Sequence, residues 1–127
     1  MKIKTSSELI QNSLKEIKTI SPNEALKLSN ENKCNLIDIR EISELEATGK
    51  IKNSLHIPRG VLEFSIHPTS PFFKKEKIDS NKEMILFCAA GGRSALAAKT
   101  LQDMGFEKVS HIDGGFSLMI NSGFEID

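Results

Sequence analysis

The sequence predicts an α/β fold in which a central, mainly parallel sheet is flanked by helices. Apolar runs with the composition of buried strands alternate with helical segments along most of the chain, and this alternation is typical of parallel sheets. The length of 127 residues fits one domain with its own hydrophobic core. We expect residues 20–127 to form that domain and residues 1–19 to form a helical extension before it.

Two helices are predicted near the start of the chain from their capping signals. The segment Thr5–Glu8 has the spacing of a capping box, and apolar residues follow it at helical intervals. Ser21 can cap a second helix, and Pro22 suits the first position of that helix. This second helix is expected to run to about Asn30.

The remaining elements follow from apolar runs and glycine stops. Strands are predicted at residues 36–39, 54–57, 84–88 and 108–112, and helices at residues 42–48 and 94–104. Residues 64–81 show no clear periodicity and are predicted to form a long loop. From Lys50 to Lys77 there are six basic residues and two acidic ones. This region is therefore either a solvated surface or a positive rim that attracts an anion.

Composition argues against several classes of protein. Lys and Arg together number 17, as do Asp and Glu, so the formal net charge is zero, whereas nucleic-acid binders usually carry a basic excess. The chain has no apolar run of about 18 residues, the length that a membrane span needs, and no apolar signal-like segment at its start. We therefore expect a cytoplasmic protein that binds neither nucleic acid nor membrane. Two cysteines and three scattered histidines do not form a zinc-site pattern, so no metal is expected.

The loop after the predicted strand 84–88 carries the chemistry. Cys88 stands at the carboxyl end of that strand, where ligands bind in open α/β sheets. The following residues are small up to Arg93, and a helix is predicted from Ser94. Backbone N–H groups of a tight loop, the helix N-terminus and the Arg93 charge all stabilise an anion. We therefore expect the thiolate of Cys88 to be favoured and the residue to be a nucleophile. A buried, inert cysteine is the alternative, and we favour that structural role for Cys34, which has no glycine loop beside it.

The segment Cys88–Ser94 resembles the active-site signature of the rhodanese family of sulfurtransferases, which has a cysteine, two residues, a glycine, one residue, an arginine and often a serine. Residues 38–41, 49–60 and 113–116 are similar, in the family's order, to its other motifs, and the resemblance extends from about Ile20 onward. Lys50 stands where the family commonly has histidine, and Asn53 where it usually has glycine. No tryptophan follows residues 113–116, which should change packing rather than chemistry.

The resemblance implies sulfur transfer through a Cys88 persulfide, from a donor such as thiosulfate to cyanide or a thiol, with no cofactor. Protein phosphatases with a cysteine nucleophile have five residues between cysteine and arginine, whereas this chain has four, so a phosphatase or arsenate reductase is disfavoured. A non-enzymatic sulfur-relay module that receives persulfide from a partner protein remains an alternative. The chain is expected to be a monomer or a homodimer.

Supporting roles are assigned to residues of the loop and of two neighbouring segments. Arg59 is a candidate for binding the sulfonate end of a donor, with a surface ion pair as the alternative. Asp38 and Arg40 are expected to give structural support. The residues expected to contact substrate around Cys88 are Ala89, Ala90, Gly91, Gly92, Arg93 and Ser94.

Overall fold

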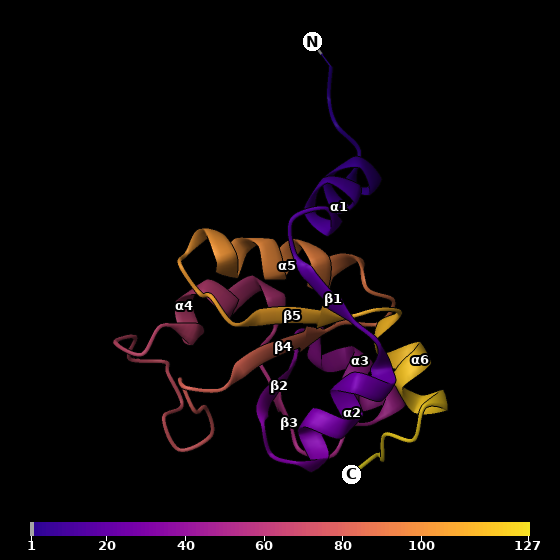
Figure 1. Ribbon diagram of the computed structural model, residues 1–127, viewed down its shortest axis with the longest axis vertical. Coiled ribbons are helices and arrows are strands. Elements are labelled where there is room, and N and C mark those ends of the chain that lie inside the picture. Colours follow the sequence, from indigo (N-terminus) through magenta and orange to yellow (C-terminus); the bar gives the residue numbers. More distant parts are fainter. Residues whose placement is uncertain (1) are drawn as a thin grey trace.

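A computed structural model describes residues 2–127 of the chain (Figure 1). Five strands form one sheet, and they are β1 (Lys18–Ile20), β2 (Cys34–Asp38), β3 (Ser54–His56), β4 (Glu83–Phe87) and β5 (Val109–Ile112). The α-helices are α1 (Ser6–Leu14), α2 (Pro22–Asn30), α3 (Ile42–Thr48), α4 (Leu62–Ile66), α5 (Gly92–Asp103) and α6 (Gly115–Asn121), with a 3₁₀-helix η1 at Arg59–Val61.

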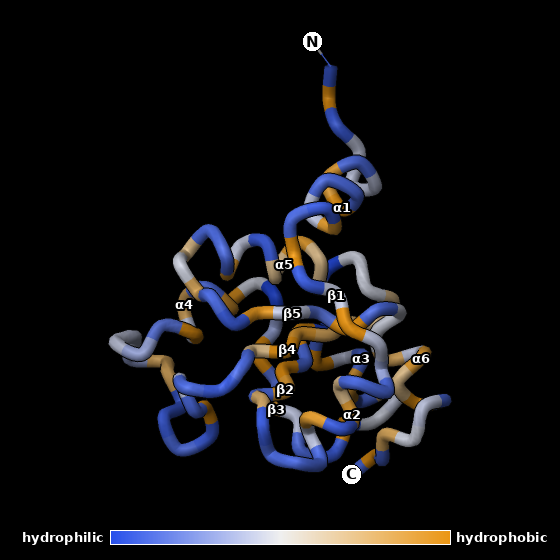
Figure 2. The backbone as a smooth tube through the Cα atoms, in the orientation of Figure 1, coloured by the Kyte–Doolittle hydropathy of each residue, from blue (hydrophilic) through white to orange (hydrophobic). Residues whose placement is uncertain are grey.

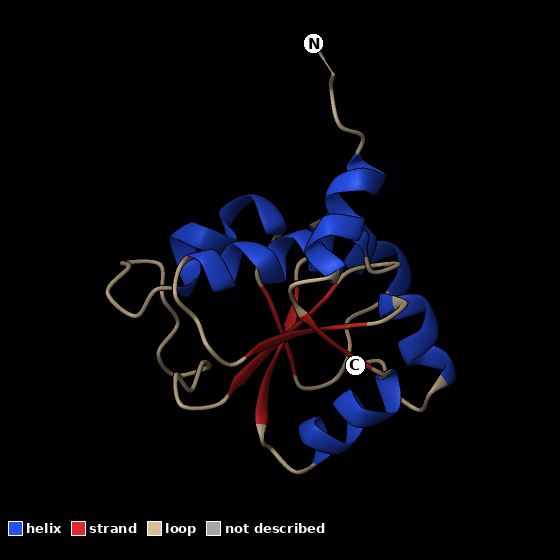
Figure 3. Cartoon of the chain, turned by 45° about the horizontal axis from the view of Figure 1, so that its top comes forward, coloured by secondary structure: helices blue, strands red, loops and turns tan. Residues whose placement is uncertain are grey.

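The sheet is parallel, and its strand order is β1-β5-β4-β2-β3. Helices cover both of its faces (Figure 3). One core contains side chains of α4 and α5, and the other contains side chains of α2 and α6. Hydrophobic residues are concentrated along the central strands between these two layers (Figure 2). The predicted α/β fold with a central parallel sheet is thus confirmed.

Local sequence explains where several helices begin. The Ser21 hydroxyl accepts a hydrogen bond from the Glu24 amide at 3.1 Å, and Pro22 is the first residue of α2. Thr5 caps α1 in the same way through the Glu8 amide. Both capped helices were predicted from these signals, and the predicted end of α2 at Asn30 is confirmed.

Some predicted boundaries were wrong, and short elements were missed. Helix α5 begins at Gly92, two residues before the predicted Ser94, because the left-handed Gly91 turns the chain directly into the helix. Helix α4 falls partly inside the predicted loop at residues 64–81, since five residues are too few to show a helical period. Strand β1 and helix α6 were not predicted at all.

The N-terminal segment lies against the sheet and against α5. Strand β1 is an edge strand that pairs with β5, with Thr19 opposite His111. Helix α1 lies beside α5 (Figure 1), and Lys99 of α5 forms an ion pair with Glu16 at 2.9 Å. Among the described residues, no helix has the length and apolar character needed to cross a membrane.

Candidate active site

The parallel sheet brings the sequence-predicted loops together at one edge. Strands β2, β4 and β5 all end there, so Cys88 directly after β4 lies between the segments that follow β2 and β5. Strands β2 and β4 are neighbours in the sheet although β3 lies between them in the sequence. The carboxyl edge at such a point is the usual ligand site of open α/β sheets.

The sulfur of Cys88 accepts hydrogen bonds from two backbone N–H groups. The Gly91 amide donates to Sγ at 3.2 Å, and the Ser94 amide donates to Sγ at 3.4 Å. The residue is 1% exposed, and it faces the N-terminus of the twelve-residue helix α5. Two N–H dipoles and the helix N-terminus therefore point at one buried sulfur atom, an arrangement that favours negative charge on it. Gly91 makes the turn with a φ of 109°, a conformation that disfavours side chains.

A second glycine turn holds this loop from outside. The Phe116 amide donates to the carbonyl oxygen of Cys88 at 2.8 Å, and the Ser117 amide donates to that of Ala89 at 3.2 Å. A Cβ atom on Gly115 would overlap the Cys88 carbonyl oxygen. The double glycine after β5 is therefore required for the start of α6 to approach the Cys88 loop this closely.

Arg93 lies at the rim of the loop and is held by Glu44 of α3. Its two terminal nitrogens each donate to one carboxylate oxygen at 2.8 Å. Glu44 also accepts a hydrogen bond from the Glu41 amide, as the third residue of a capping box. Hydrogen bonding to Arg93 lowers the pKa of Glu44 from 4.5 to about 2. Glu44 raises the pKa of Arg93 further above its ordinary range, so the guanidinium stays charged beside Cys88.

Asp38 and Arg40 form a buried ion pair beneath these loops. Arg40 is 1% exposed, and its guanidinium donates to both Asp38 oxygens at 2.8–3.1 Å. The same guanidinium donates to the Thr48 hydroxyl at 2.8 Å and lies 4.2 Å from the centre of the Phe116 ring. One side chain thus joins the end of β2, the end of α3 and the start of α6.

Ser94 connects the Cys88 sulfur to two residues outside the loop. The Ser94 hydroxyl oxygen is 3.6 Å from Cys88 Sγ and 2.9 Å from Nδ1 of His111. His111 is 2% exposed, and its Nε2 is 3.0 Å from the hydroxyl oxygen of Thr19. Burial lowers the pKa of His111, and the charge of Asp113 opposes this effect.

Arg59 is the predicted site residue that the structure does not bring to the loop. Its guanidinium donates to Glu63 at 2.7 Å and to the Thr100 hydroxyl at 3.2 Å. Thr100 lies toward the C-terminal end of α5, about two turns from the helix N-terminus that faces Cys88. Arg59 therefore makes an ion pair with Glu63, as its alternative role describes, and its binding of a donor stays a prediction.

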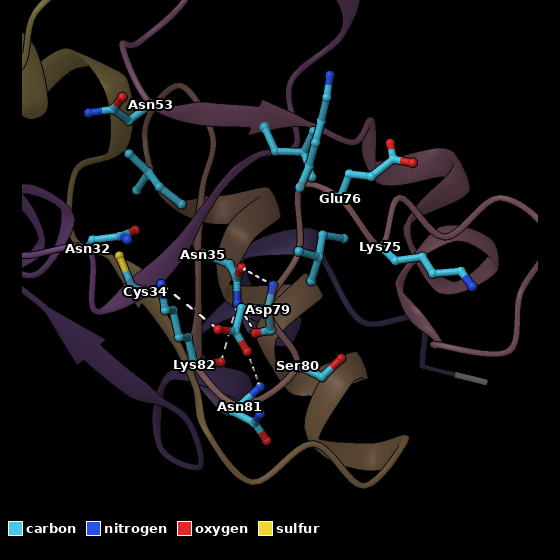
Figure 4. A pocket seen from close by; sticks show the side chains of 14 residues that line it. Asn32, Cys34, Asn35, Asn53, Lys75, Glu76, Asp79, Ser80, Asn81 and Lys82 are labelled. Atoms are coloured by element: carbon cyan, nitrogen blue, oxygen red, sulfur yellow. Dashed lines mark hydrogen bonds and ion pairs between the residues drawn. The ribbon is translucent and has the colours of Figure 1, made fainter.

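Cys34 lies at the opposite edge of the sheet, because it begins β2 while Cys88 follows β4. Figure 4 shows it beside a polar cavity. The volume of this cavity is about 630 Å³, and in its lining the side-chain amide of Asn35 donates to the backbone carbonyl oxygen of Asp79 at 2.8 Å. Burial, with a contribution from Glu83, raises the pKa of the Cys34 thiol to about 11. This thiol therefore stays protonated near neutral pH. Among residues 2–127 no cluster of His, Cys, Asp and Glu side chains is suited to a metal ion.

Three residues at the site were not predicted from sequence. Glu44 and His111 contact the loop from distant parts of the chain, and Phe116 covers Arg40. The spacing of Glu41 and Glu44 before a short helix is a capping signal, but it says nothing of Arg93. No sequence signal identified His111.

The fold and the cysteine loop define a rhodanese-like protein. The family model of the Rhodanese-like domain matches residues 21–121. The match covers well over half of the chain, and the protein belongs to this family.

Individual relatives agree with this assignment. Thiosulfate sulfurtransferase GlpE of Pseudomonas entomophila (strain L48) is 32% identical over 105 residues, which cover 83% of this chain and 86% of GlpE. YrkF of Bacillus subtilis (strain 168), named as a candidate sulfur carrier protein, is 32% identical over 89 residues, which cover 70% of this chain. The chain spans only 43% of the length of YrkF.

Two solved structures extend the similarity across nearly the whole chain. Protein RPA3614 of Rhodopseudomonas palustris CGA009, of unknown function and described as a possible tyrosine phosphatase, has a TM-score of 0.88 at 37% identity and covers 100% of this chain and 97% of its own. The polysulfide-sulfur transferase homodimer of Wolinella succinogenes has a TM-score of 0.73 at 32% identity and covers 94% and 85%.

Proposed function

We propose that the protein is a sulfurtransferase that carries sulfane sulfur on Cys88 as a persulfide. The observation that carries this proposal is the pair of backbone N–H groups, from Gly91 and Ser94, that donate to the Cys88 sulfur at the N-terminus of α5. These donors stabilise a thiolate before the reaction and an anionic persulfide after it. Membership of the rhodanese-like family and similarity to thiosulfate sulfurtransferases support the same chemistry.

The reaction is a two-step covalent transfer. The Cys88 thiolate attacks the outer sulfur of thiosulfate, a new S–S bond forms, and the S–S bond of the donor breaks to release sulfite with the electron pair. An acceptor such as cyanide then attacks the outer persulfide sulfur and leaves as thiocyanate, and the electron pair returns to Cys88 Sγ as thiolate. No external oxidant, reductant or metal takes part in either step. Arg93 supplies the fixed positive charge beside the incoming anionic donor.

Phosphate-ester hydrolysis is the less favoured chemistry for this loop. Four residues separate Cys88 from Arg93, and two backbone amides donate to the sulfur itself at 3.2 and 3.4 Å. Such a short loop suits a single sulfur atom better than a phosphoryl group with three oxygens. The name given to RPA3614 makes para-nitrophenyl phosphate a useful negative control, and we expect no turnover of it.

A sulfur-relay role is the second candidate, and the burial of Cys88 favours it. At 1% exposure, the thiol gives a freely diffusing donor little direct access, which is expected to slow turnover with small molecules. The similarity to YrkF, named as a candidate sulfur carrier, is in keeping with this role. Rapid thiocyanate formation from thiosulfate and cyanide supports the enzyme. Slow turnover, combined with persulfide loading by a cysteine desulfurase, supports the relay.

The test of the proposed function compares two cysteine variants. We expect Cys88→Ser to abolish thiocyanate formation and Cys34→Ser to keep most of it, because only Cys88 of the two lies in an anion-stabilising loop. Urea unfolding of both variants controls for folding. Full activity in Cys88→Ser, or its loss in Cys34→Ser alone, would reject Cys88 as the sulfur carrier.

A further inference from the structure

A hydrogen-bonded chain leads from the buried Cys88 sulfur to the surface. Its atoms are Cys88 Sγ, Ser94 Oγ, His111 Nδ1 and Nε2, and Thr19 Oγ1, at successive separations of 3.6, 2.9 and 3.0 Å across its three contacts. Ser94 and His111 are 0% and 2% exposed, whereas Thr19 is exposed. The parallel register that pairs Thr19 with His111 builds the outer contact.

The number of protons in this chain allows two arrangements, which differ in the direction of every hydrogen bond. A hydroxyl carries one proton, and a neutral imidazole carries one on either Nδ1 or Nε2. When Cys88 is a thiol, it donates to Ser94, Ser94 donates to Nδ1, and the Nε2–H of His111 donates to Thr19. A thiolate can only accept. The Ser94 hydroxyl can then donate either to Sγ or to the Gly91 carbonyl oxygen, which lies 3.2 Å from it. In the order that serves the sulfur, Ser94 donates to Sγ, the Nδ1–H of His111 donates to Ser94, and Thr19 donates to Nε2.

The change from one order to the other moves one proton from Cys88 to water. The thiol proton passes to Ser94, the Ser94 proton passes to Nδ1, the Nε2 proton passes to Thr19, and the Thr19 proton passes to solvent. His111 keeps one proton throughout, so its charge does not change. The electron pair of the broken S–H bond stays on Cys88 as the thiolate.

We propose that His111 is a positioning residue that directs the Ser94 hydroxyl toward the sulfur of Cys88 and, with Thr19, connects that sulfur to solvent protons. The inference deepens the proposed function and rests on the role that it gives to Cys88. In the thiolate order, the Nδ1–H of His111 occupies a lone pair of Ser94 and polarises its O–H bond toward the sulfur. In the opposite tautomer, Nδ1 would join the Gly91 carbonyl oxygen in competing with the sulfur for the single Ser94 proton.

The surroundings of His111 keep it neutral, as this role requires, since an imidazolium has no acceptor nitrogen. From β1 the facing side chain is Thr19, from α5 it is Ser94, and the β4 residue opposite is the apolar Leu86. Burial lowers the pKa of His111, and the negative charge of Asp113 partly opposes this shift. Near neutral pH the ring is therefore uncharged.

The test measures how fast iodoacetamide alkylates Cys88 as a function of pH, in a Cys34→Ser background. Replacing His111 by leucine removes the donor to Ser94, and we expect the rate profile to move upward by about half to one pH unit, the equivalent of one hydrogen bond. Replacing it by asparagine places an amide N–H close to the position of Nδ1, and we expect this variant to recover most of the shift. A purely structural role would not distinguish these two variants by their profiles.

Thr19 allows an independent pair of variants. Because Thr19 is exposed, these variants should fold even if the substitutions at His111 do not. Thr19→Val removes the hydroxyl at nearly constant shape and should move the rate profile in the same direction. Thr19→Ser keeps the hydroxyl, so its profile should stay close to that of the wild type. Profiles that coincide with wild type in both Thr19→Val and His111→Leu overturn the inference, as does an asparagine variant that behaves like leucine.

Failure of this inference is distinguishable from failure of the proposed function. Alkylation reports the state of the Cys88 sulfur without any sulfur transfer. Absence of thiocyanate from the wild-type protein would reject the enzymatic role and would leave the alkylation profiles readable. Normal thiocyanate formation with unshifted profiles would reject only the positioning role of His111.

Discussion

Replacing Arg93 by alanine tests whether the guanidinium at the rim of the Cys88 loop binds an anionic sulfur donor. Its two terminal nitrogens each donate one hydrogen bond to Glu44 at 2.8 Å. A guanidinium carries five N–H groups in a rigid fork, so most of its donors remain available to a ligand such as thiosulfate. The Glu44 contact thus orients the group without exhausting it.

The size of the effect follows from the exposure of Arg93. A hydrogen bond to a charged group contributes about 1.5–3 kcal/mol, but the Arg93 side chain is 39% exposed, so water screens part of that energy. We expect kcat/KM for thiosulfate to fall about 10- to 30-fold in Arg93→Ala, which corresponds to about 1.4–2 kcal/mol. Loss of the Glu44 ion pair should also lower the free energy of unfolding by about 0.5–1 kcal/mol.

Steady-state formation of thiocyanate from thiosulfate and cyanide is the assay. Arg93→Lys keeps the charge but loses the planar fork, so its kcat/KM should lie between wild type and alanine. Lys99→Ala removes a positive charge from the same helix, away from the loop, and should behave like wild type. A kcat/KM in Arg93→Ala close to wild type would refute the reasoning and would leave the backbone amides as the whole anion site.

Three further predictions concern stability, measured by urea unfolding. The first concerns Glu44, whose pKa is lowered from 4.5 to about 2 by its hydrogen bonds with Arg93. This carboxylate therefore stabilises the fold above pH 4.5 and loses that effect as the pH falls toward 2. Wild type should exceed Glu44→Gln by about 1 kcal/mol at pH 7 and match it near pH 2, and a constant difference would contradict this. Gly115→Ala should cost at least about 2 kcal/mol and most of the activity, whereas Gly60→Ala, with no atom within 4 Å of the new Cβ, should change stability by less than about 0.5 kcal/mol; equal effects would refute the close approach. Asp38→Ala should cost about 3–5 kcal/mol because it leaves the buried Arg40 charge without its carboxylate partner. The double variant Asp38→Leu/Arg40→Met should recover most of that loss, and a double variant as unstable as Asp38→Ala would contradict this explanation.

Sequence was sufficient for elements that carry their own local signals. Helix α2 could be predicted from Ser21 and Pro22, because a capping hydroxyl and an N-terminal proline act within one turn. Helix α6 could not be predicted, because Gly114 and Gly115 both have positive φ and look like a turn rather than a helix start. Strand β1 has three residues, too few for a recognisable alternation.

The candidate site also contains a part that the sequence could predict and a part that it could not. The loop from Cys88 to Arg93 is contiguous, so the donors around the sulfur could be anticipated from glycine content and the following helix. The partners of that loop could not, because Glu44 and Arg93 are 49 residues apart and Thr19 and His111 are 92 apart. Those contacts arise from strand order and register, which no single segment encodes.

The most direct test of the central claim is the mass of the Cys88 peptide after the protein reacts with thiosulfate alone. Covalent transfer through this sulfur predicts a gain of one sulfur atom, about 32 Da, on that peptide. Cyanide should remove the added mass, and the Cys34 peptide should never carry it. An unmodified Cys88 peptide in protein that still converts thiosulfate and cyanide to thiocyanate would contradict the account.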